Sequence, residues 1–77
     1  MPTVVSKNGF RLMIYTNDHE PMHVHAVYQG RKAVIEFEPE VRLRDNRGLN
    51  RIELRTAMKL TRDHQQLLIE KWREIYG

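Results

Sequence analysis

The segment Asp18–His25 holds three of the four histidines in the chain. His23 and His25 are two residues apart, so on a β-strand both side chains project from one face, about 6–7 Å apart. An imidazole titrates near neutral pH, so two neighbouring imidazoles can serve as general acid and general base. This spacing predicts an exposed histidine pair that is able to transfer protons.

Three further side chains are predicted to share the face of His23 and His25. Tyr15 and Arg11 can stabilise a developing anion there. Glu36 is expected opposite His23, where a carboxylate can orient the ring and favour its protonated form. The alternative is an exposed His23–Glu36 cross-strand pair contributing under about 1 kcal/mol. The candidate catalytic residues are therefore His23, His25, Glu36 and Tyr15.

The same histidines can also bind a divalent metal ion. His23 and His25 would supply two ligands, and His19 or Asp18 from the preceding loop a third. A catalytic zinc site requires three protein ligands whose outer partners fix their orientation, and only two ligands are secure from spacing. Metal binding by His19, His23 and His25 is thus the weaker alternative, and no other cofactor is implied.

A second group of residues with chemical potential is basic. Between residues 42 and 55 arginine occurs five times and lysine not at all, against one aspartate and one glutamate. Guanidinium groups match the geometry of phosphate oxygens, so this cluster can bind nucleic acid. The alternative is a solvated surface that keeps the protein soluble. The candidate nucleic-acid-binding residues are Arg42, Arg44, Arg47, Arg51 and Arg55.

Length and composition exclude several classes of protein. A chain of 77 residues has room for one domain, residues 1–77. The absence of cysteine excludes a disulfide framework and thiolate metal sites, and it fits a cytoplasmic protein. No apolar run is long enough to cross a membrane. The chain contains no nucleophile elbow, phosphate-binding loop, dinucleotide fingerprint or zinc-finger spacing.

The first half of the chain alternates with period two, which indicates β-strands. Asn8-Gly9 is a strong hairpin signal because a type I′ turn needs positive φ at both central positions. Gln29-Gly30 is a weaker signal of the same kind, and Pro39 ends the strand that follows it. The expected strands are Thr3–Ser6, Phe10–Thr16, His23–Tyr28, Arg31–Glu38 and a short edge strand Val41–Arg44.

These turns set the pairing of the strands. One face of the resulting sheet is nearly all apolar and must form the core, whereas the other is mixed and should contact water. The predicted pairs are Val5 with Leu12, Thr3 with Ile14, Val24 with Ile35, and His23 with Glu36.

The second half of the chain has helical periodicity. Asn50 and Glu53 form a capping box, so a helix should begin at Arg51. A single helix to the end would be longer than the sheet, so a break is expected near Thr61–Asp63. The predicted fold is α+β: a four- to five-stranded antiparallel meander (about 3–44) with two C-terminal helices (about 51–61 and 64–76) on one face. The second helix should pack Leu67, Leu68, Trp72 and Ile75 on the sheet.

Several motifs along the chain are similar to those of one bacterial family, the domain-of-unknown-function family numbered four-one-six-zero. The resemblance covers nearly the whole chain, although that family usually has proline where Met22 stands and an aromatic residue where Val24 stands. It implies a small protein encoded beside a second small protein, in pairs that resemble toxin–antitoxin modules, and it implies no established activity. The matching patterns are D-H-x-P-x-H-x-H (Asp18 to His25), G-x-x-A-x-I (Gly30 to Ile35) and H-x-x-L-L-x-x-x-W (His64 to Trp72).

Two main hypotheses follow for the function. The first is a binding module that contacts nucleic acid through its arginines and a partner protein through a sheet edge or its helices. The second is a ribonuclease-like toxin in which His23 and His25 act as acid and base. The first ranks slightly higher because no third group fixes the histidines and no nucleophile motif is present. The helical spacing is also compatible with a homodimer.

Overall fold

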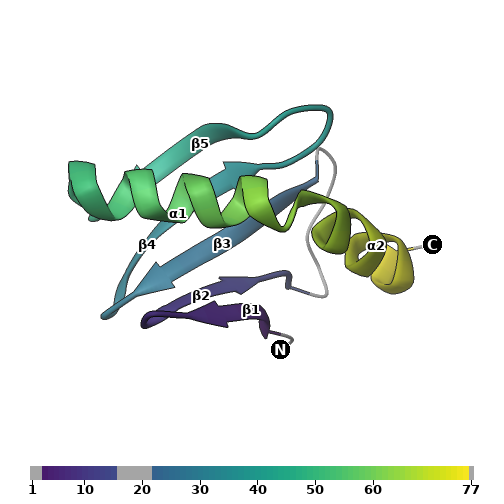
Figure 1. Cartoon of the computed structure of the whole chain (residues 1–77), viewed down its shortest axis with the longest axis horizontal. Coiled ribbons are helices and arrows are strands. Elements are labelled where there is room, and N and C mark those ends of the chain that lie inside the picture. Colours follow the sequence, from purple (N-terminus) through teal and green to yellow (C-terminus); the bar gives the residue numbers. More distant parts are fainter. Residues whose placement is uncertain (1–2, 16–21, 77) are drawn as a thin grey trace.

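The protein is an α+β structure in which a five-stranded antiparallel sheet is followed by two helices (Figure 1). The computed structural model describes residues 3–15 and 22–76. The strands follow each other in chain order across the sheet, so the predicted meander and fold class are confirmed. The elements are β1 (Thr3–Lys7), β2 (Phe10–Met13), β3 (His23–Tyr28), β4 (Arg31–Glu36), β5 (Arg42–Arg47), α1 (Arg51–Asp63) and α2 (Gln65–Tyr76).

Both predicted hairpin turns are present. Asn8 and Gly9 have φ values of 54° and 84°, and Gln29 and Gly30 have values of 49° and 78°. Positive φ at both central positions is the requirement of a type I′ turn, whose twist matches that of the flanking strands. These local turns therefore fix the register of β1 with β2 and of β3 with β4.

The register agrees with the sequence prediction at all but one pair. Val5 lies opposite Leu12, and the predicted β3–β4 pairs are also found. Thr3 lies opposite Met13, however, and not opposite Ile14. The ladder is irregular between Thr3 and Val5, where the extra residue of a β-bulge shifts the pairing by one position. Nothing in the residue pattern had marked this bulge.

The predicted helix start and helix break are both confirmed. The Asn50 side chain accepts a hydrogen bond from the Glu53 backbone N–H at 2.8 Å, and the Glu53 carboxylate accepts one from the Asn50 N–H at 3.0 Å. The break falls at His64, which caps α1 and whose Nδ1 lies 2.9 Å from the Leu60 carbonyl oxygen. α1 therefore extends to Asp63, two residues further than predicted, and α2 begins at Gln65, one residue later.

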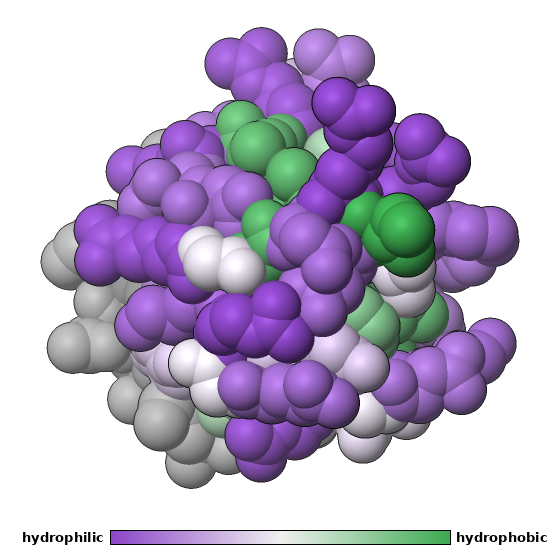
Figure 2. Space-filling view, turned by 90° about the vertical axis from the view of Figure 1, so that its left-hand side faces the viewer, coloured by the Kyte–Doolittle hydropathy of each residue, from purple (hydrophilic) through white to green (hydrophobic). Residues whose placement is uncertain are grey.

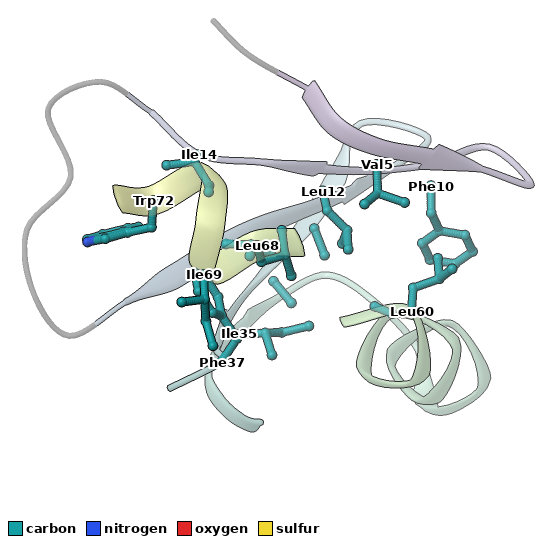
Figure 3. Close-up of a cluster of buried hydrophobic side chains, with 14 of the residues drawn as sticks. Val5, Phe10, Leu12, Ile14, Ile35, Phe37, Leu60, Leu68, Ile69 and Trp72 are labelled. Atoms are coloured by element: carbon teal, nitrogen blue, oxygen red, sulfur yellow. The ribbon is translucent and has the colours of Figure 1, made fainter. Parts of the chain in front are cut away.

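The apolar core lies between one face of the sheet and the two helices (Figure 3). We call this face, which carries Phe10, Leu12, Val24, Ala26, Ala33 and Ile35, the covered face. In Figure 3, Leu60 of α1 points towards Phe10, and Trp72 of α2 lies at the opposite end of the cluster. Trp72 and Leu68 are buried as predicted, but Leu67 is 37% exposed and Ile69 is buried. The prediction for Leu67 was wrong because its side chain lies on the outer side of α2.

An ion pair ties α1 to the covered side of the sheet. Both terminal guanidinium nitrogens of Arg31, at the start of β4, donate to the Glu53 carboxylate at 2.6 and 2.8 Å. Arg31 and the Asn50 N–H hold the pKa of Glu53 below its usual value because both favour the ionised form. At the other end of α1, the Gln65 side chain donates to the Phe37 carbonyl oxygen at 2.6 Å.

The surface is mostly hydrophilic in the view of Figure 2, where hydrophobic groups appear at a few places. In the described part of the chain, the exposed large hydrophobic side chains are Leu43, Ile52 and Leu67, and Ile52 in the first turn of α1 is 74% exposed. Among the described residues, no helix is both long and apolar enough to span a membrane.

Candidate functional site

The second face of the sheet points away from the core, and we call it the open face. Paired residues of neighbouring strands point to the same side, so the register arranges this face in three rows across the sheet. Most of its side chains are exposed or half-buried, whereas those of the covered face are almost all buried. The first row is Ser6, Arg11, Val27 and Lys32; the second is Met13, His25, Val34 and Asp45; the third is His23, Glu36 and Arg42.

The first row places two cations on either side of an apolar residue. Arg11 and Lys32 are exposed and flank the half-buried Val27. Within the described part of the chain, neither Arg11 nor Lys32 forms a salt bridge. This row therefore presents positive charge that described carboxylates do not neutralise.

Four rings meet at the other end of the open face, and they belong to β3, to α2 and to Tyr15, two residues after the end of β2. Tyr15 and His25 are stacked, with ring centroids 4.1 Å apart and an interplanar angle of 26°. His25 and His23 lie edge to face with centroids 5.2 Å apart. The His23 ring in turn lies 5.7 Å from that of Trp72. The predicted grouping of Tyr15, His23 and His25 on one face is therefore what the structure has.

Helix α2 supports this ring cluster from the end of the sheet. Trp72 packs against Tyr76 at 4.5 Å and against Phe37 of the core at 6.1 Å. The Tyr76 hydroxyl donates a hydrogen bond to the backbone carbonyl oxygen of Tyr15. Trp72 thus contacts both the core and the third row. The sequence marked Trp72 as a core residue at helical spacing, but it contained no signal for the contact with His23.

The prediction that both histidines are exposed is wrong for His23. Its side chain shares a face with His25, but the residue is only 7% exposed, whereas His25 is half-buried. The physical reason is tertiary: Trp72 covers His23 from α2. Of the two imidazoles, His25 is the more accessible to a ligand.

The position of Glu36 agrees with the prediction, since it is paired with His23 in the ladder. Its carboxylate oxygen lies 3.6 Å from Nε of Arg42, the next residue in the row. An ion pair to an exposed guanidinium competes for the carboxylate that was expected to orient His23. The orienting role of Glu36 stays a prediction.

The three-histidine metal site falls partly outside the described residues. His19 is not among them, so the full set of His19, His23 and His25 has no geometry to report. Within residues 3–15 and 22–76, no three or more His, Cys, Asp or Glu side chains are grouped to hold a metal ion. Metal binding stays a prediction.

The fold divides the arginine cluster between strand and helix. Arg42 lies in the third row, and Arg47 pairs with Asp45 of the second row through an Nε–Oδ2 contact of 2.7 Å. Arg44 is the extra residue where the β4–β5 register shifts. Arg51 and Arg55 are exposed in the first two turns of α1, which packs on the covered face. Arg11 and Lys32 were not grouped with these arginines because their proximity depends on the pairing of β2, β3 and β4.

Comparison with known protein families assigns the chain to one of them. A family model with the description "Domain of unknown function (DUF4160)" matches residues 9–73. The chain belongs to this family. The DUF4160 match includes Tyr15, His23, His25 and Trp72, whereas Tyr76 lies beyond it. Neither a curated protein nor a solved structure gives a significant match.

Proposed function

We propose that this DUF4160 protein binds nucleic acid through the open face of its sheet, as one component of a toxin–antitoxin-like pair. The observation that supports this most directly is the first row, in which exposed Arg11 and Lys32 flank Val27 away from the helices. Cations on an accessible surface attract the phosphate backbone and release its counterions on binding. The proposed role belongs in the cytoplasm.

The basic side chains of the open face differ in how much of their positive charge is free to bind phosphate. Arg42 and Arg47 lie beside the carboxylates of Glu36 and Asp45, which offset part of their charge. Binding should therefore depend more on Arg11 than on either of these two arginines. Arg44, Arg51 and Arg55 would contribute at the β5 edge and at α1, with smaller effects.

The test is salt-dependent binding of a labelled single-stranded RNA, followed by fluorescence anisotropy. Each phosphate contact contributes about −0.7 to the slope of log K against log salt concentration for single strands. The double variant Arg11→Ala/Lys32→Ala should bind more weakly, with a slope that is smaller in magnitude by about 1.4.

The matched control is Arg51→Ala/Arg55→Ala, which removes the same net charge from α1. This control should lose less affinity than the open-face variant. A triple variant, Arg42→Ala/Arg44→Ala/Arg47→Ala, measures the contribution of β5. Equal losses of RNA affinity in the two double variants would refute the assignment to the open face. An affinity that does not change with salt concentration would refute the proposed function.

The family resemblance supports a second small protein as the partner. The outer edges of β1 and β5 offer backbone groups to which a partner strand can pair. Co-expression with the product of the adjacent gene, followed by size-exclusion chromatography, tests this part. Separate elution of the two proteins at all concentrations would refute the pair.

A second candidate function is RNA cleavage by His23 and His25. The centroid distance of 5.2 Å between these rings favours it, because an acid and a base must both reach one reacting phosphate. The burial of His23 counts against it. If expression is toxic, and His25→Gln abolishes toxicity while the protein still folds and binds RNA, cleavage is supported. A non-toxic wild type that leaves labelled RNA intact would exclude it.

A further inference from the structure

We infer that the stacked Tyr15–His25 pair is a platform for an unpaired base, so that the ligand is a single strand and not a duplex. This inference rests on the proposed function and adds to it the form of nucleic acid and the residues that select it. It does not require either histidine to transfer a proton.

The platform consists of two flat rings at one end of the open face. Tyr15 and His25 are half-buried and already parallel to within 26°, at 4.1 Å between centroids. Half-buried Met13 and Val34 flank His25 in the second row, so the border of the platform is apolar. Because the two rings stack on each other, a base would extend this stack from its outer side, where the π-face of any base can stack. The platform therefore provides affinity without base-specific hydrogen bonds.

The cations of the first row are placed to hold the backbone of the same strand. His25 and Val27 are two residues apart on β3, so their rows are about 7 Å apart. A base stacked at Tyr15–His25 would place neighbouring phosphates near Arg11 and Lys32. In a duplex the bases are paired and stacked on each other, and exposing one costs unpairing energy. The arrangement therefore favours single strands.

Helix α2 fixes the platform without contacting the ligand itself. Trp72 holds the His23 ring, against which His25 packs, and Tyr76 holds the backbone of Tyr15. Trp72 and Tyr76 are thus positioning residues. Because Tyr76 bonds to a carbonyl oxygen, replacing the Tyr15 side chain leaves that bond available.

The first experiment uses the wild-type protein and three probes. These are a labelled single-stranded RNA, an abasic strand with the same phosphates, and a duplex of the same sequence. The intact single strand should bind roughly tenfold more tightly than the abasic strand, because stacking on aromatic residues is lost with the bases. The salt slopes of the intact and abasic strands should be equal, since both present the same phosphates.

The second experiment uses Tyr15→Leu and His25→Leu. Each should weaken binding of the intact strand several-fold, leave the salt slope unchanged, and leave binding of the abasic strand unchanged. Tyr28→Leu is the matched control: Tyr28 stacks on Phe10 at 4.2 Å, but on the covered face. Circular dichroism establishes that each variant is folded, and the wild-type probe comparison does not depend on any variant.

The outcomes separate this inference from the function on which it rests. If the abasic strand or the duplex binds as tightly as the intact strand, with a normal salt slope, the platform is refuted and phosphate binding stands. If no probe shows salt-dependent binding, both are refuted.

Discussion

The two faces of the sheet share the same strands but have different surroundings. Along β4, Ile35 points to the covered face and is fully buried, whereas its neighbour Val34 points to the open face and is half-buried. On the covered face, side-chain volume and apolarity are set by packing against α1 and α2. On the open face packing constrains little, so the rings and charges found there are the better candidates for binding a ligand.

In the third row of the open face, the difference in burial between the two faces disappears. His23 belongs to the open face by its register, yet it is as buried as the core residues Val5 and Ile69, and the Trp72 ring lies against it. The end of the sheet thus joins the core to the ring cluster.

The largest expected effect on stability comes from removing Trp72, which joins the core to the ring cluster. Trp72→Ala should lower the free energy of unfolding by about 3–5 kcal/mol, because a large buried ring leaves a cavity. In the wild type, diethyl pyrocarbonate should modify His25 before His23, and in a folded Trp72 variant this difference should shrink. Equal rates in the wild type would contradict the burial of His23.

The neighbours Ile35 and Val34 test the two faces directly. Ile35→Ala should cost about 2–5 kcal/mol, as truncation of a buried residue does. Val34→Ala should cost about 1 kcal/mol or less, since its side chain remains partly in water. Urea denaturation measures both values. Equal costs would mean that something also covers the open face.

The cap of α1 supports the helix that makes one face covered. Asn50→Ala should lower stability by about 1 kcal/mol, because the Glu53 backbone N–H loses its acceptor. Asn50→Asp, which retains a capping oxygen, should unfold at a temperature closer to that of the wild type than to that of Asn50→Ala. An unchanged midpoint for Asn50→Ala would show that the cap is dispensable.

Each face of the sheet has an ion pair, and the contributions of these two pairs to stability should differ by a smaller amount. Arg31 binds Glu53 through two short contacts, whereas Arg42 approaches Glu36 at 3.6 Å and is exposed. Arg42→Ala should change stability by less than about 0.5 kcal/mol, the usual range for exposed pairs. Arg31→Ala should cost more, in the same denaturation assay. The reverse order would contradict the role of Arg31 as a tie to α1.

The Arg31–Glu53 ion pair also predicts that the stability of the fold depends on pH. The pKa of Glu53 is lowered in the folded protein, chiefly by Arg31 and then by the Asn50 N–H. A carboxylate with a lowered pKa stabilises the fold fully above its unfolded value of about 4.3, and this contribution disappears as pH falls through the folded pKa. Glu53→Gln should remove that part of the acid destabilisation. An unchanged difference between the two proteins across this pH range would contradict it.

Most of the fold was predictable because its determinants are local. Asn8-Gly9 and Gln29-Gly30 fixed two hairpins through backbone conformation, and Asn50 with Glu53 fixed the start of α1 through hydrogen bonds within one turn. The missed features are not local. The bulge between Thr3 and Val5 shifts one pair, and the exposure of Leu67 depends on how α2 is turned against the sheet.

The sequence by itself determined that His23 and His25 share a face, because alternation along a strand is a property of the backbone. Only the tertiary structure decided that His23 is covered while His25 is accessible, and that Arg11 and Lys32 form one row. These facts depend on where α2 ends against the sheet and on the pairing of three strands. Such contacts join residues far apart in the chain, and no local spacing encodes them.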